Sequence, residues 1–326
     1  AIMLAVKSIV VDRMSIARAA ANLGVAWNTA SDAILAAGTE LLIDQPDRLD
    51  GVTCVGVDEH VWRHTRHGDQ YVTVIIDLTP TRTKTGTSRL LAVVEGRSKQ
   101  AFKSWLEAQT DSFRDQVEIV AMDGFTGYKS AAVEAIDSVI TVMDPFHVVA
   151  LVGDKLDHCR QRVQQDTLGH RGRSGDPLYG IRRVARTRAA LLTTKQQHRL
   201  AKVLADQRHV AFEVTWSVYQ EVIDAYQAPD PVEGKKIMTQ LIDSLKTGVP
   251  TGLDELRSLG QTLHRRRADI LAFFDHPGTS NGPTEAVNGL LEHLRGTARG
   301  FRNIVNYVAR CLLDAGGFRP LIHCLL

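Results

Sequence analysis

The chain has 326 residues, of which 44% are hydrophobic and 23% are charged, and its formal net charge is +2. This composition excludes a disordered chain, and no apolar run approaches the ~20 residues that a transmembrane helix requires. The length predicts two or three units, the first residues lack the pattern of a signal peptide, and the four cysteines are widely spaced, so we expect a cytoplasmic protein with no membrane partner and no disulfide framework.

Residues 1–37 are predicted to form a helix-turn-helix. Ser15 can cap a helix over 16–23, Gly24 suits the turn, and a second helix follows over 26–35. In such a motif the second helix enters the DNA major groove, so the predicted DNA contacts lie near its start: Trp27, Asn28, Thr29 and Ser31. The alternative is a small helical hairpin packed on the core.

Residues 38–51 are predicted to be a linker, and residues 52–147 are predicted to form a sheet with covering helices. Apolar, β-branched runs place strands at 52–58, 71–77, 90–95, 117–122 and 139–143, with helices at 98–109 and 127–136. The helix between the third and fourth strands indicates a mixed sheet, so the fold class is α/β.

Three acidic residues are placed on rigid elements of this unit. The first strand ends on Asp58 and the fourth is followed by Asp123, while Glu285 falls in the first turn of a helix that Pro283 is placed to start. Three carboxylates held in this way match what a pair of hard divalent cations needs. Two other helical acids could compete for the third position, Glu255 and Glu292.

Three histidines follow the first acid within ten residues: His60, His64 and His67. Their spacing coincides with a polar turn between strands. We therefore expect contact with solvent or DNA, and not a zinc site.

Residues 148–280 are predicted to be an all-α insertion, because no strand is compelling there and the separation of Asp123 from Glu285 exceeds what a helical return to the sheet needs. Residues 281–326 then complete the core. Between Lys155 and Arg188 there are nine Lys or Arg against three Asp. This excess predicts a phosphate-binding face formed by Arg171, Arg173, Arg182, Arg183, Arg186 and Arg188, although a solvated helix surface would have the same composition. Further positive charge follows Glu285, at Arg295, Arg299 and Arg302.

The chain resembles the DDE transposases of the ISL-three insertion-sequence family over residues 51 to about 315. The matching phrases, in order, are Gly56-Val57-Asp58-Glu59-His60, Tyr71 to Leu78, Met122-Asp123-Gly124-Phe125, Asp144-Pro145-Phe146-His147-Val148, Glu285-Ala286-Val287-Asn288-Gly289 and Gly300-Phe301-Arg302-Asn303. Each phrase alone has little specificity. Their order and spacing together make the resemblance specific.

The resemblance implies an RNase H-like catalytic domain in which Asp58, Asp123 and Glu285 are the catalytic residues and hold two Mg²⁺ or Mn²⁺ ions. It also implies DNA strand cleavage and strand transfer, with the element's terminal repeats and target DNA as double-stranded partners and a homo-oligomer on DNA. By likeness to the family, Asp144 and His147 are expected near the active site. The alternative is that Asp144 only caps a helix and His147 has no role in the reaction. Two alternatives stay open, a catalytically silent DNA-binding regulator and a structure-specific nuclease of the same fold.

Overall fold

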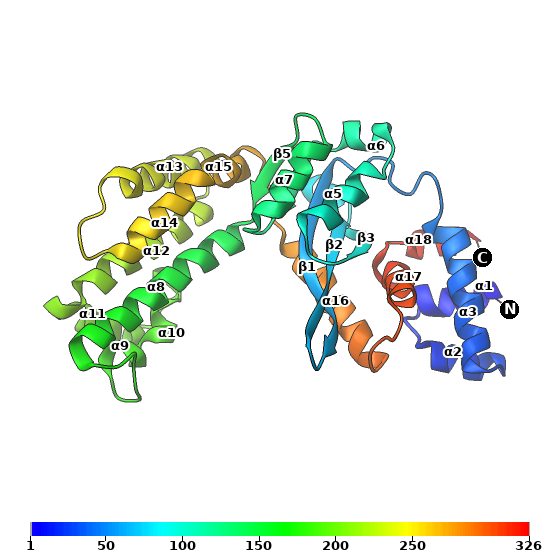
Figure 1. Cartoon of the computed structure of the whole chain (residues 1–326), viewed down its shortest axis with the longest axis horizontal. Coiled ribbons are helices and arrows are strands. Elements are labelled where there is room, and N and C mark those ends of the chain that lie inside the picture. The colour runs from blue at the N-terminus through cyan, green and yellow to red at the C-terminus, as the bar shows by residue number, and fades with distance from the viewer. Residues whose placement is uncertain (1, 326) are drawn as a thin grey trace. The chain divides into compact units, whose positions relative to one another are not determined.

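The computed structural model describes residues 2–325 and divides the chain into two compact units (Figure 1). The first unit extends to residue 142 and resumes at 278, and the second comprises residues 143–277. The sequence placed the corresponding bounds at 148 and 280. Within the described residues, no helix is both long enough and apolar enough to cross a membrane.

The first unit is built on a five-stranded sheet of mixed direction. Its strands are β1 Cys54–Thr65, β2 Gly68–Asp77, β3 Arg89–Glu95, β4 Ile119–Met122 and β5 Ile140–Met143. The order across the sheet is β3-β2-β1-β4-β5, with β2 antiparallel to β1 and β3, and β4 parallel to β1. The prediction of an α/β fold with a mixed sheet is confirmed.

Strand β1 is longer than predicted. The sequence placed its end at Asp58, whereas antiparallel pairing with β2 continues from Asp58 to Thr65. The parallel pairing with β4 stops one residue before Asp58, at Val57 and Met122. Asp58 therefore lies where the parallel partner ends, and β1 runs on because its antiparallel partner is still present.

The extension of β1 also changes the environment of the histidines. His60 and His64 belong to the strand, and His60 is 9% exposed. The expected contact of His60 with solvent or DNA is therefore wrong, because the period of two along the strand turns this side chain inward. His64 is exposed, and its Nδ1 lies 2.5 Å from Asp69 Oδ1 across the hairpin.

Helices cover one face of the sheet. These are α5 Lys99–Glu107, α6 Asp111–Gln116 and α7 Thr126–Ala135, and a short helix, α4 Thr79–Arg82, follows β2. Phe102 and Tyr128 from these helices share a buried cluster with Val55 and Val57 of β1 and with Met122 of β4. Since side chains alternate along a strand, Gly56 and Asp58 face the opposite side of the sheet. Helix α16, Gly282–Thr297, lies on that opposite side, alongside β1 (Figure 1).

The two ends of the chain pack together within the first unit. The N-terminal helices are α1 Ile2–Val10, α2 Ile16–Leu23 and α3 Trp27–Gly38, followed by a π-helical turn over Thr39–Ile43, and the C-terminal helices are α17 Ile304–Ala315 and α18 Arg319–Leu325. Ser15 caps α2 by accepting a hydrogen bond from Arg18 N, and Gly24 ends α2 in the left-handed conformation, as predicted. Leu313, Phe318 and Ile322 share one buried cluster with α1, α2 and α3.

The predicted linker is ordered at both ends. Gly38, expected to begin the linker, is the last residue of α3, and a Cβ added there would lie 2.7 Å from Leu313 Cδ2. Glycine at this position lets Leu313 of α17 approach α3 closely.

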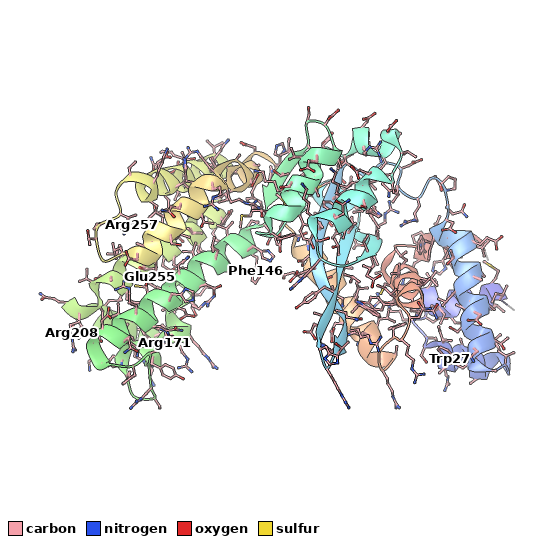
Figure 2. All side chains as sticks on the ribbon, in the orientation of Figure 1. Trp27, Phe146, Arg171, Arg208, Glu255 and Arg257 are labelled. Carbon is pink, nitrogen blue, oxygen red and sulfur yellow. The ribbon has the colours of Figure 1, made fainter. Side chains whose placement is uncertain are left out.

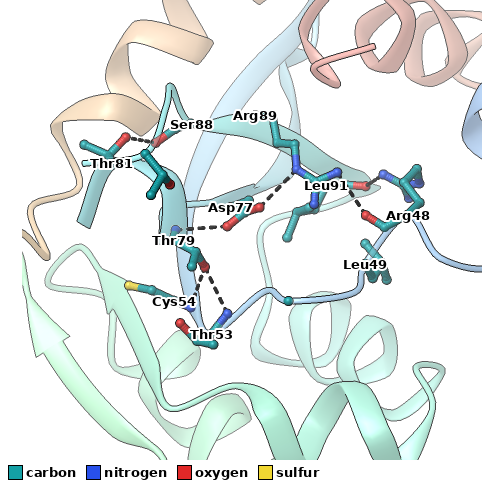
Figure 3. A network of polar contacts seen from close by, with 12 residues as sticks. Arg48, Leu49, Thr53, Cys54, Asp77, Thr79, Thr81, Ser88, Arg89 and Leu91 are labelled. Atoms are coloured by element: carbon teal, nitrogen blue, oxygen red, sulfur yellow. Dashed lines mark hydrogen bonds and ion pairs between the residues drawn. The ribbon is translucent and has the colours of Figure 1, made fainter. Parts of the chain in front are cut away.

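Farther along this segment, Arg48 donates to Leu91 O at 2.9 Å (Figure 3). Arg89 in turn donates to Arg48 O at 2.9 Å and to the buried Asp77 Oδ2 at 3.0 Å. Thr79 Oγ1 accepts from the backbone N–H of Thr53, at the entrance to β1. This network holds the entry to β1 against the edge of the sheet.

The second unit is helical throughout its described residues. Its helices are α8 Pro145–Leu168, α9 Pro177–Gly180, α10 Arg182–Ala185, α11 Thr194–Leu204, α12 Val210–Gln227, α13 Pro231–Thr247, α14 Asp254–Arg265 and α15 Arg267–Asp275, with short 3₁₀ turns at Ala189–Leu191 and Gln207–His209. Its core includes the fully buried Phe212, Met238, Leu259 and Ile270.

Leu313→Ala tests the shared core of the two chain ends. Leu313 is 1% exposed, so its truncation should lower the free energy of unfolding by about 2–5 kcal/mol in urea denaturation. Leu321→Ala is the matched control, because Leu321 is 51% exposed and its truncation should cost less than about 0.5 kcal/mol. Equal effects of the two changes would contradict the packing of α17 against the N-terminal helices.

Candidate active site

The pairing of β1 with β4 places two aspartates at neighbouring positions. Val57 and Met122 are parallel register partners, and Asp58 and Asp123 are the next residues in each chain segment. Adjacent strands lie roughly 4.8 Å apart, so the two carboxylates start from neighbouring backbone positions. Asp123 Oδ1 accepts from Phe125 N at 2.8 Å, which fixes the turn between β4 and α7.

The start of α16 packs on β1 beside these acids. Asn281 Nδ2 donates to Val57 O at 3.2 Å, and Thr284 Oγ1 donates to Asn281 Oδ1. Both side chains are buried. A Cβ on Gly56 would lie 2.8 Å from Asn281 Oδ1 and from Thr284 Oγ1, so this contact exists only because residue 56 has no side chain.

One turn further along α16, Asn288 holds the first acid. Its Nδ2 donates to Asp58 Oδ2 at 3.0 Å, while Glu59 N donates to Asp58 Oδ1 at 2.8 Å. Asn288 Oδ1 is buried, and no partner for it is present among the described residues. Glu285 is exposed and lies three residues before Asn288, which places it on the same side of the helix.

The three acids do not form a preformed metal-binding cluster in this structure. Within residues 2–325, no three His, Cys, Asp or Glu side chains converge closely enough to hold a metal ion. The donors nevertheless fit a hard cation by chemistry, since carboxylate oxygens and the unpartnered amide oxygen of Asn288 are the ligands that Mg²⁺ and Mn²⁺ prefer.

Comparison with known proteins gives the family. A family model described as a transposase, that of the ISL-three DDE group, matches residues 55–311, which is most of the chain. The chain belongs to this family. Two relatives from Mycobacterium tuberculosis, strains CDC 1551 / Oshkosh and ATCC 25618 / H37Rv, are each named transposase for insertion sequence element IS1557. Each is 26% identical over 324 residues, which cover 91% of this chain and 68% of the relative. The resemblance expected from the sequence motifs is confirmed.

Burial shifts the pKa of two groups that lie near the acids of this family member. Burial raises the pKa of Tyr128, and the nearby Asp123, Glu59 and Asp58 raise it further, against a lowering by the hydrogen bond to Thr73. Tyr128 therefore stays protonated and neutral beneath the site. Burial lowers the pKa of His60, which Glu292 partly offsets.

The competing acids are both engaged by arginines. Glu292 forms an ion pair with Arg295, and hydrogen bonding to Arg295 lowers the pKa of Glu292. Glu255, in the second unit, accepts from Arg162 Nε at 2.8 Å. The pairing leaves Glu285 as the exposed acid in the first turn of α16.

Asp144 and His147 open the second unit. The Asp144 side chain is 2% exposed and caps α8 by accepting from Phe146 N at 3.0 Å. His147 Nδ1 lies 3.4 Å from Asp144 Oδ2. The helix cap, one of the two interpretations of this motif, is therefore present.

The basic segment of the second unit divides into paired and exposed arginines. Arg186 lies 2.9 Å from Asp157 and 3.3 Å from Asp154, and Arg188 lies 3.7 Å from Asp224. Arg182 stacks over the Tyr179 ring at 4.1 Å. Arg186 is exposed as well as paired, and the exposed members outside these contacts are Arg171, Arg173 and Arg183. Part of the positive charge of this segment is thus neutralised by ion pairs within the second unit.

The predicted DNA contacts on α3 differ in their exposure to solvent. Trp27, at the start of α3 (Figure 2), is 52% exposed, and Asn28 and Thr29 are exposed as well. Ser31 is an exception, because it is 2% exposed and its hydroxyl is not offered to a DNA groove. Arg299 and Arg302 are exposed in the segment after α16, where Arg299 adopts a positive φ of 57°.

Sequence reasoning missed three residues that position the site: Asn281, Thr284 and Asn288. The signal was present, since Asn281, Thr284 and Asn288 follow one another at spacings of three and four residues, which places them on one side of the helix start.

Gly56→Ala tests the packing of α16 on β1. The added methyl group would crowd Asn281 and Thr284, so the free energy of unfolding should fall by about 1–3 kcal/mol in urea denaturation. Gly289→Ala, in α16, is the matched control, because nothing lies within 4 Å of an added Cβ there and alanine should stabilise the helix by up to about 1 kcal/mol. A Gly56→Ala protein as stable as the parent would show that α16 does not contact β1 at this point.

Proposed function

We propose that this transposase cleaves DNA strands at the ends of an insertion sequence and joins them to target DNA, in a divalent-metal-dependent reaction. Asp58, Asp123 and Glu285 are its catalytic residues. The observation that carries the proposal is the register of β1 and β4, which puts two aspartates side by side, together with the docking of α16 beside them.

The core is proposed to be RNase H-like. Its support is the sheet order β3-β2-β1-β4-β5, with three antiparallel strands and a fourth parallel to the central one. The acids follow this arrangement, since Asp58 lies on the central strand and Asp123 at the end of its parallel neighbour. A large helical unit separates them from the helix that carries Glu285.

Asp58, Asp123 and Glu285 are proposed to hold two Mg²⁺ ions, with Mn²⁺ as a substitute. When bound, the ions supply Lewis-acid chemistry that lets a water or a 3′-hydroxyl attack a phosphodiester and stabilises the departing oxygen. The chain itself orients the ligands. Asn288 fixes one oxygen of Asp58, and the backbone N–H of Glu59 fixes the other. No covalent bond between enzyme and DNA is needed.

The substrates are proposed to be double-stranded DNA, as terminal repeats and as target, bound by a homo-oligomer. The helices α2 and α3 serve as a helix-turn-helix, with Asn28 and Thr29 exposed for groove contacts. The exposed arginines 171, 173 and 183 supply phosphate contacts. Asp144 and His147 are proposed as auxiliary residues of the same reaction.

Glu285→Gln should abolish cleavage of terminal-repeat DNA in Mg²⁺, because the change removes a ligand charge and keeps the shape of the side chain. Asp58→Asn and Asp123→Asn should behave in the same way. DNA binding, followed by gel shift, should remain near the parental level for all three variants.

Glu292→Gln is the matched control on the same helix. Glu292 is paired with Arg295, so its variant should keep most of the cleavage activity. Cleavage by Glu285→Gln together with loss of cleavage in Glu292→Gln would assign the third acid to Glu292. The products also separate the alternatives, since a nuclease yields nicks without joined strands and a silent regulator yields neither.

A further inference from the structure

A cavity of about 750 Å³ lies inside the first unit, away from the three acids. It is bounded by α2 and α3 on one side and, on the other, by the end of α16, the segment that follows it and one side of α17. Its volume falls within the roughly 300–1,000 Å³ typical of sites for small molecules. It contains the Gly300-Phe301-Arg302-Asn303 motif, to which the reaction above gives no role.

Helix α3 presents one stripe of side chains to this cavity. Trp27, Ser31 and Leu35 line it, at spacings of four residues, whereas Asn28 and Thr29 do not. Ser31 is thus on the side of α3 that is turned away from solvent, whereas Asn28 and Thr29 are exposed. It also separates Trp27 from the residues available to a DNA groove.

The lining of the cavity is strongly cationic. Four arginines, Arg13, Arg299, Arg302 and Arg310, line it against a single acid, Asp314. Arg310 is 5% exposed, donates from Nη2 to Met14 O at 3.1 Å, and lies 3.9 Å from Asp314. Its Nη1 is buried with no partner among the described residues. A buried guanidinium with an unpaired N–H donor is stabilised when an anion binds to that donor.

The same cavity offers aromatic surface. Trp27 and Phe301 both line it, one on α3 and one in the segment after α16. Phe301 is held by an edge contact with the buried Tyr307, at a centroid distance of 5.1 Å. Aromatic rings of this kind stack on unpaired bases and do not discriminate strongly between sequences.

We propose that this cavity binds one unpaired nucleotide, with its phosphate at Arg310 and Arg302 and its base against Trp27 and Phe301. The proposal rests on the proposed function in so far as DNA is the substrate. It assigns Trp27 to the capture of a nucleotide, which a paired duplex cannot present. The same chemistry would accept a free nucleoside monophosphate, so the test includes both sources.

The test measures binding of the full chain to short duplexes that differ only in one unpaired 3′ nucleotide, by fluorescence anisotropy without divalent cations. The parent should bind the overhang duplex more tightly than the blunt one. Trp27→Ala should reduce this preference about ten-fold, because it removes the ring on which the base stacks. Arg302→Gln should reduce it by a similar factor, because it removes a charged contact to the phosphate. Trp27→Phe should keep most of it. Both changed residues are exposed, so the variants should fold, which circular dichroism checks.

Arg18→Gln is the control, because Arg18 is exposed on α2 and does not line the cavity. It should leave the preference unchanged. A parent with no preference, or Trp27→Ala that weakens both duplexes equally, would overturn the proposal. Competition by deoxyadenosine monophosphate would assign the site to a free nucleotide, and its absence with an intact preference would assign it to the DNA strand. The binding assay contains no metal, so its outcome does not depend on whether the protein cleaves DNA.

Discussion

The site depends on the absence of a side chain at residue 56. Gly56 lets Asn281 and Thr284 lie directly against β1. This contact fixes the position along β1 at which α16 begins. Asn288 then reaches Asp58, and Glu285 stands one turn earlier. A helix that returns to the sheet after the long second unit is thus placed by a few buried polar contacts. The donors Asn281 Nδ2, Thr284 Oγ1 and Asn288 Nδ2 each have a partner on β1 or at the start of α16.

The N-terminal and C-terminal helices pack together in the same unit as α16 and β1. Helix α17 is the next helix after α16 and contributes Leu313 to the cluster that holds α1, α2 and α3. The helices proposed to bind DNA therefore share a core with α17, the next helix after the one that carries Glu285. Arg48 and Arg89 fasten the connection from α3 to β1 onto the sheet. Within the first unit, the proposed DNA contacts and the proposed catalytic residues are thus linked through packed elements rather than through a free linker.

The sequence predicted the strands, the helical character of the second unit and the caps, because these follow from local periodicity and turn chemistry. It placed the end of β1 too early, since the length of a strand depends on which neighbours continue to pair with it. It gave no role to Asn288, because a hydrogen bond to Asp58 is visible only once α16 is placed on β1. Ser31 was misjudged for the same reason, as the side of α3 that becomes buried is decided by distant residues.

The central claim is that Asp58, Asp123 and Glu285 form one metal site. Anomalous diffraction from a crystal grown with Mn²⁺ tests it most directly, because the scattering locates the ions without assuming any ligand. The account predicts anomalous density next to Asp58 and Asp123, with Glu285 as a further ligand at roughly 2.0–2.3 Å, a distance typical of hard cations. Density at Glu292 or Glu255, with none beside the two aspartates, would contradict it.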